Sequence, residues 1–183
     1  MVVLAVVTVP LAGGRLLALS EVDVRWAWAL PLALGVQVVV VSVAPDAPAP
    51  IPEALHLGSY VLAGAFLAAN VRTIPGLWLI TLGGGLNVLA IAVNGGTMPA
   101  SPGALASAGL DVAGAGFANS DVVPGARLSW LGDVFAIPDR WPLSNVFSVG
   151  DVVLALGVVV AIHGICGSKI ALRRRSHGVA PTP

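Results

Sequence analysis

The sequence predicts an all-α membrane protein, a bundle of about five transmembrane helices with one long loop lying over its outer end. Three observations support this fold class. Hydrophobic residues make up 57% of the chain and charged residues only 10%, with a mean hydropathy of +0.94, whereas an ordinary soluble domain carries about 25% charged residues. The apolar residues are gathered in runs close to the length that crosses a bilayer, about 20 residues. The basic residues are divided unevenly among the segments that connect these runs.

Four apolar segments have the length of a transmembrane helix or nearly so, and a fifth is shorter. The four are residues 26–44, 54–71, 74–93 and 146–166. The N-terminal run, residues 2–12, can be lengthened through residues 13–17 if Arg15 reaches the lipid headgroups, so a full or a partial crossing by residues 2–19 stays open. This run lacks the basic region and the clear cleavage site of a signal peptide. We therefore expect a fifth, short span.

Five spans place the ends of the chain on opposite sides of the membrane, and the basic residues indicate which end is inside. With a cytoplasmic C-terminus, seven of the nine basic residues lie inside, namely Arg15, Arg25, Arg72, Lys169, Arg173, Arg174 and Arg175. Arg127 and Arg140 lie outside. This division follows the positive-inside rule. It predicts one integral membrane domain over residues 1–172 and a cytoplasmic basic tail over residues 173–183.

The fourth span carries small and polar residues on one side. At 100° per residue, this face comprises Gly83, Gly84, Asn87, Ala90 and Asn94. Small residues let helix backbones approach closely, and asparagine can form a hydrogen bond across the contact. We expect a packing seam in which Gly84 touches a neighbouring helix. The alternative is a polar groove that opens outward at Asn94.

The outer loop, about residues 94–145, holds much of the chain's polar and aromatic chemistry. Residues 101–109 predict a short helix, with Ser101 as N-cap, a proline in the first position and Gly109 at the end. Further on, LSWLGDVFAIPDRWPLSNVFSVGD concentrates Trp130, Trp141 and three acids just before the last span. Tryptophan is favoured at headgroup depth. We therefore expect this stretch to lie as a lid over the bundle.

The lid suggests a site on the outer face. We expect Ser144 or Asn145 to cap the last helix, and Asp133, Asp151 and Asn94 to surround one outward-facing pocket. An acid in the first turns of a helix is also favoured by the helix dipole, which is a structural explanation for Asp151. The candidate ligand-binding residues are Asn87, Asn94, Asn145, Asp151, Trp130 and Trp141, and the candidate catalytic residues are Asp133 and Asp151. The single cysteine excludes an intrachain disulfide, no metal site is expected, and no cofactor can be named.

Two blocks of the sequence resemble a known family. RTIPGLWLITLGGGLNVLAIAVNGGTMP and LSWLGDVFAIP with PLSNVFSVGDVVLALG are similar to small bacterial multi-pass membrane proteins catalogued as a domain of unknown function (family 5317), over roughly residues 55–165. The resemblance implies a bacterial plasma-membrane protein and supplies no activity. GDVFAIPDRWPLSNVFSVGDVV is also similar, more weakly, to the second aspartate block of lipoprotein signal peptidase. The first block of that family is not matched, because Ala90 stands where an acid is expected and no arginine follows.

Three functions stay open. The first is a non-enzymatic membrane protein that binds a lipid, a quinone or a membrane partner at the outward-facing pocket. The second is an intramembrane hydrolase or lipid-modifying enzyme, which needs two carboxyl groups, here Asp133 and Asp151, to activate water and donate a proton. The third is a small transporter or channel subunit, which the lack of charge near the centre of any span disfavours. The expected partners are membrane lipids, a membrane protein or a second copy of the chain, and the net charge of zero argues against nucleic acid.

Overall fold

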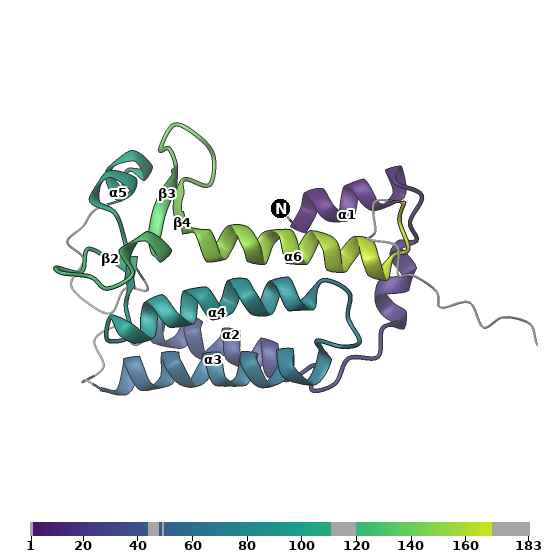
Figure 1. Ribbon diagram of the computed structural model, residues 1–183, viewed down its shortest axis with the longest axis horizontal. Coiled ribbons are helices and arrows are strands. Elements are labelled where there is room, and N and C mark those ends of the chain that lie inside the picture. The colour runs from purple at the N-terminus through teal and green to yellow at the C-terminus, as the bar shows by residue number, and fades with distance from the viewer. Residues whose placement is uncertain (1, 44–47, 49, 111–119, 170–183) are drawn as a thin grey trace, which may run out of the picture.

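In the computed structural model, which describes residues 2–43, 48, 50–110 and 120–169, the chain is mainly helical (Figure 1). The α-helices are α1 (Val2–Leu11), α2 (Ala29–Val38), α3 (Ile51–Asn70), α4 (Leu77–Val93), α5 (Pro102–Ala108) and α6 (Val149–Ile165). Short 3₁₀ helices occupy η1 (Leu16–Glu21) and η3 (Ser129–Leu131), and a π-helical turn, η2 (Val39–Val43), extends α2. The predicted basic tail, residues 173–183, lies outside the described residues.

The long loop also forms β-structure, so the all-α class is wrong in this detail. β1 (Met98–Pro99) pairs in parallel with β2 (Ser120–Asp121), and β3 (Asp133–Ile137) pairs antiparallel with β4 (Asn145–Ser148). Valine, phenylalanine and isoleucine in β3 and β4 favour strands. Pairing also satisfies backbone groups that would otherwise be buried without a partner against the helix ends.

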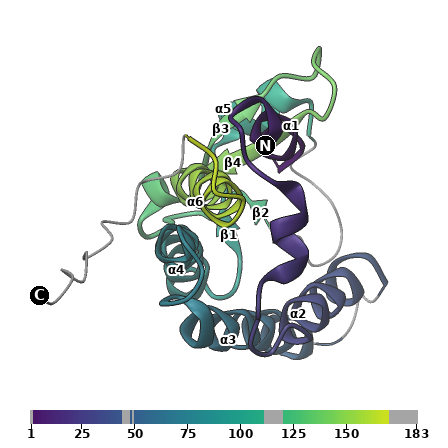
Figure 2. The same ribbon diagram turned by 90° about the vertical axis from the view of Figure 1, so that its right-hand side faces the viewer.

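Among the described residues, α3 is the helix long and apolar enough to cross a membrane, with 20 residues. The other apolar helices, α1, α2, α4 and α6, have 10–17 residues. The helices pack in the order α2, α3, α4, α6, α1, with a short turn joining α3 to α4. Viewed end-on, α2, α3, α4 and α6 follow an arc (Figure 2). The mainly helical architecture is therefore confirmed.

Two predicted helix boundaries need correction. The N-terminal helix does not continue through residues 13–17, because Gly13 takes a positive φ of 74° and the chain turns. A Cβ atom on Gly14 would lie 3.0 Å from the carbonyl oxygen of Cys166, so glycine permits this turn to rest against the end of α6. The last helix begins at Val149 and not at Val146, because Val146 belongs to β4.

The contact between α4 and α6 depends on glycine. A Cβ atom on Gly83 would lie 2.5 Å from the carbonyl oxygen of Gly150, and one on Gly157 would lie 2.6 Å from the backbone nitrogen of Ile80. The expectation that Gly84 forms this seam is wrong, since a Cβ atom there meets nothing within 4 Å. Adjacent residues of a helix point 100° apart, so of these two neighbouring glycines it is Gly83 that faces α6.

Candidate functional site

The outer-loop end of α6 starts with a reciprocal hydrogen-bonded cap. Ser148 Oγ accepts a hydrogen bond from the backbone nitrogen of Asp151 at 3.0 Å, and Asp151 Oδ2 accepts one from the backbone nitrogen of Ser148 at 2.9 Å. This capping box satisfies donors that the first turn leaves without helical partners. The prediction that Ser144 or Asn145 caps the helix is wrong. The β3–β4 pairing begins at Asn145, opposite Ile137, and keeps the chain extended up to Ser148.

Asn87 connects this cap to α4. Its Nδ2 atom donates a hydrogen bond to Asp151 Oδ1 at 2.7 Å, and its Oδ1 atom lies 2.9 Å from the Ser148 hydroxyl. Asn87 thus provides the interhelical hydrogen bond expected from the fourth span. Both oxygens of the Asp151 carboxylate accept hydrogen bonds from neighbouring residues of the chain.

Asp133, at the start of β3, lies buried with only 5% of its surface exposed. Ser120 Oγ donates a hydrogen bond to its Oδ2 atom at 2.5 Å, and its backbone is paired with Ser148 across the small sheet. Burial raises the pKa of Asp133, the hydrogen bond from Ser120 lowers it, and the nearby charge of Asp151 raises it further. Asp133 therefore holds a proton more readily than an exposed aspartate does.

These polar groups surround a cavity of about 490 Å³ between the two small sheets, the middle of α3 and the outer-loop halves of α4 and α6. We call it the aspartate cavity. Its polar lining consists of Tyr60, Asn87, Ser120, Asp133, Asn145 and Asp151, and its apolar lining of Ile91, Met98, Val146, Phe147 and Leu154. Of the candidate site residues, the structure thus brings together Asn87, Asp133, Asn145 and Asp151.

A second, apolar hollow of about 430 Å³ adjoins the aspartate cavity. We call it the α6 groove. It is lined by Ile137, Asn145, Phe147, Asp151, Val152, Ala155 and Leu156. Asn145, Phe147 and Asp151 line both spaces, so a polar chamber and an apolar groove meet at the first turn of α6.

Three candidate residues lie away from the aspartate cavity. Asn94 Nδ2 donates to the carbonyl oxygen of Arg127 at 2.8 Å, and Asn94 Oδ1 accepts from the backbone nitrogen of Arg127 at the same distance. The side-chain amide of Asn94 therefore binds the backbone of the loop, and the expectation that Asn94 lines the outward-facing pocket is wrong. Trp130 is 63% exposed and lines a separate cavity of about 560 Å³. Trp141, 60% exposed, lies in the turn between β3 and β4.

Three residues of this site were not predicted from the sequence, namely Tyr60, Ser120 and Ser148. Tyr60 is the one tyrosine of the chain, and that rarity was an available signal. Ser120 lies in a polar, glycine-rich stretch without periodicity, so nothing in its surroundings indicated a fixed position. Ser148 stands three residues before Asp151, which is the spacing of a capping box.

Comparison with known proteins places the chain in a family. No curated protein and no solved structure matches it, so nothing in these comparisons bears on the similarity to lipoprotein signal peptidase. A family model described as "Family of unknown function (DUF5317)" matches residues 21–163. That match includes every residue that lines the aspartate cavity and the α6 groove. The chain belongs to the DUF5317 family, whose function is not known.

Proposed function

We propose that this protein is an integral protein of the bacterial plasma membrane that binds an amphiphilic membrane molecule, a lipid or a quinone, at its outer face. The observation that carries the proposal is the junction of the aspartate cavity with the α6 groove. In our proposal, a molecule with a polar end and an apolar chain occupies both spaces at once, passing the three residues that line both. Ligand sites commonly combine an apolar lining with a few polar groups that orient the ligand.

The exposure of apolar side chains supports a membrane location. Large hydrophobic residues point outward from several helices, for example Val3 (74% exposed), Leu34 (62%), Val61 (72%) and Leu156 (50%). Extended apolar surface of this kind marks contact with lipid or with another protein. At 1.5 Å per residue, the 17 residues of α4 and of α6 each reach about 25 Å, close to the hydrocarbon thickness of a bilayer.

The two ends of the bundle differ in charge, which supports the orientation. At one end, the backbone nitrogen of Arg15 bonds the carbonyl oxygen of Cys166 and that of Lys169 bonds the carbonyl oxygen of Ala12, while Arg25 is held by Asn70. The other end carries Arg127 and Arg140 among its described residues. The positive-inside rule puts the first end in the cytoplasm.

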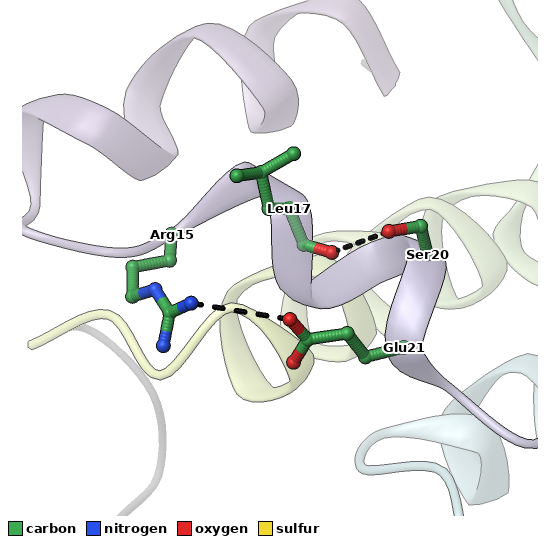
Figure 3. Close-up of polar contacts among 4 residues, drawn as sticks. All are labelled: Arg15, Leu17, Ser20 and Glu21. Atoms are coloured by element: carbon green, nitrogen blue, oxygen red, sulfur yellow. Dashed lines mark hydrogen bonds and ion pairs between the residues drawn. The ribbon is translucent and has the colours of Figure 1, made fainter.

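The basic end also carries a solvated ion pair. Arg15 and Glu21 lie 3.9 Å apart on the short connection between α1 and α2, with side chains 75% and 64% exposed (Figure 3). So exposed a pair contributes little stability. It is compatible with water or headgroups at this end and incompatible with hydrocarbon.

Cysteine labelling in intact cells tests the orientation. In a chain carrying Cys166→Ala, Ser107→Cys on α5 should react with a membrane-impermeant thiol reagent. Ser20→Cys, on the connection shown in Figure 3, should react only after the cells are permeabilised, although both serines are exposed. If the Ser20→Cys variant alone reacts in intact cells, the orientation of the protein in the membrane is the reverse of the one proposed.

The direction of the α6 groove fits a lipid. Val152, Ala155 and Leu156 follow the capped start of α6, so the groove runs from the outer end of the bundle along the helix. With a polar group in the aspartate cavity, an acyl or isoprenoid chain in the groove points toward the middle of the membrane. Membrane lipids have this same orientation.

Native mass spectrometry of the detergent-extracted protein tests amphiphile binding. We expect one lipid or quinone to remain bound to the wild type. Ala155→Trp should fill the groove and remove it, whereas Val61→Trp, on an exposed position of α3, should leave it in place. Equal retention by the two variants would show that the bound molecule does not use the α6 groove.

A second function, aspartate-dependent hydrolysis, is favoured by one specific observation. Asp133 and Asp151 line the same cavity, and burial raises the pKa of Asp133, as suits a proton donor. The hydrogen bonds from Asn87 and Ser148 to Asp151 leave it less available to activate water. Release of fatty acid from a bacterial lipid extract, lost in Asp133→Asn and in Asp151→Asn while both variants keep the unfolding temperature of the wild type, would establish this alternative.

A further inference from the structure

The two carboxylates of the aspartate cavity differ in how far the chain itself satisfies them. Both oxygens of Asp151 accept hydrogen bonds from Asn87 or Ser148. For Asp133, the hydrogen bond that the side chain accepts within the described part of the chain comes from Ser120 and reaches Oδ2. Its Oδ1 atom thus remains as an acceptor, on a residue 95% buried that lines the cavity.

Within the described part of the chain, the cavity provides acceptors and negative charge and no cation. Neither the aspartate cavity nor the α6 groove has a lysine, arginine or histidine among its lining residues. An anionic group would therefore meet two uncompensated carboxylates at close range, where the effective dielectric constant is low. A cation with N–H donors would instead compensate both charges and bond the remaining oxygen of Asp133.

We infer that the polar end of the bound amphiphile carries a primary ammonium group, as the phosphatidylethanolamine headgroup does. The inference rests on the proposed function, because the α6 groove must hold the chain of the same molecule. The ammonium lies in the aspartate cavity and donates to Asp133 Oδ1. The phosphate remains toward the mouth of the cavity and the chain follows Val152 and Leu156 along α6.

A lipid titration with three headgroups tests the inference. The purified wild-type protein in detergent is titrated with phosphatidylethanolamine, phosphatidylcholine and phosphatidylglycerol of identical acyl chains, and the bound fraction is read by native mass spectrometry. Phosphatidylcholine keeps the positive charge but has no N–H donor, and phosphatidylglycerol has hydroxyl donors but a net negative charge. A charge-assisted hydrogen bond predicts that phosphatidylethanolamine binds at least about tenfold more tightly than either.

Two variants test whether the preference for phosphatidylethanolamine arises in the aspartate cavity. Asp133→Asn keeps an acceptor for Ser120 and removes the charge, so it should reduce phosphatidylethanolamine binding to the level of phosphatidylcholine. Asp139→Asn removes an exposed carboxylate from the nearby turn, outside both linings, and should leave the preference unchanged. An unchanged preference in Asp133→Asn would overturn the role of this residue.

Further outcomes separate this inference from the proposed function. Equal affinity for the three lipids, with binding still lost in Ala155→Trp, would overturn the ammonium preference and leave amphiphile binding intact. Failure of all three lipids to bind, together with no lipid or quinone retained by the detergent-extracted wild type, would overturn the proposed function itself. Displacement of the lipid by free ethanolamine at comparable concentration would assign the cavity to a soluble amine, whereas the inference expects no displacement, because free ethanolamine has no chain for the groove.

Discussion

Replacing Gly83 with alanine should destabilise the protein, while the same change at Gly84 should not. The added carbon at Gly83 would lie 2.5 Å from the carbonyl oxygen of Gly150 and 2.5 Å from the backbone nitrogen of Leu154. That is roughly 1 Å short of ordinary contact. The obstructing atoms are backbone, so α4 and α6 must move apart, at a cost of about 1–3 kcal/mol. Separation also strains the hydrogen bond from Asn87 to the cap of α6.

Gly84 is the matched control, because a Cβ atom there meets nothing within 4 Å. Alanine should be neutral at this position or stabilise the helix by up to about 1 kcal/mol. The buried Cys166 reports unfolding, since a thiol-reactive fluorophore in detergent reacts as the side chain becomes exposed. For a chain of this size, each kcal/mol corresponds to about 2–4 °C in Tm. If Gly83→Ala unfolds at the same temperature as Gly84→Ala or above it, the two helices do not meet at this seam.

The Cys166 assay also checks the cap of α6, and two further predictions use other measurements. Ser148→Ala should lower the free energy of unfolding by about 1 kcal/mol through loss of the cap, whereas Ser144→Ala should leave it unchanged. Equal unfolding temperatures for the two variants would exclude the capping role of Ser148. Asn94→Ala should leave the backbone of Arg127 without its two hydrogen bonds. Limited proteolysis of the loop should therefore be faster, with little change in lipid retention. Loss of the bound lipid in this variant would show that Asn94 belongs to the binding site. Burial raises the pKa of Asp133, so the folded state binds its proton more tightly than the unfolded state and stability falls as pH rises through the folded-state pKa. Above about pH 4, the ordinary pKa of aspartate, Asp133→Asn should lack this decline when unfolding is followed by tryptophan fluorescence, and an identical decline in the variant would assign it to another group.

Local signals in the sequence predicted the helices well and the sheets poorly. The short helix α5 was expected from its caps, and the structure has Ser101 as N-cap and Gly109 in a left-handed conformation at the C-terminus. Such signals lie within a few residues of the element they define. The pairing of β3 with β4 depends instead on residues separated by a turn, and the irregular spacing of Phe135 and Phe147 concealed it. Strand pairing is nonlocal, and a pass along the chain cannot detect it reliably.

The candidate site was partly predictable for a related reason. In so apolar a chain, the few polar residues near helix ends attract attention, and Asn87, Asp133 and Asp151 do line one cavity. The error at Asn94 has a chemical cause. A side-chain amide presents two N–H donors and an acceptor oxygen, so it can pair with backbone groups as readily as with a ligand. Sequence position alone does not distinguish these two uses.

In our proposal, the stability of the fold and the selection of the ligand depend on different carboxylates of the same cavity. Asp151 is tied to the start of α6 by the capping box and to α4 by Asn87, so its loss should disturb folding whether or not a ligand binds. Asp133 lines the cavity, and its Oδ1 atom has no hydrogen-bond partner in the described part of the chain. A bound ammonium could donate a hydrogen bond to this oxygen without disturbing the cap of α6. If the protein binds an amphiphile as we propose, the choice of ligand depends on Asp133, whereas Asp151 stabilises the start of α6 and its contact with α4.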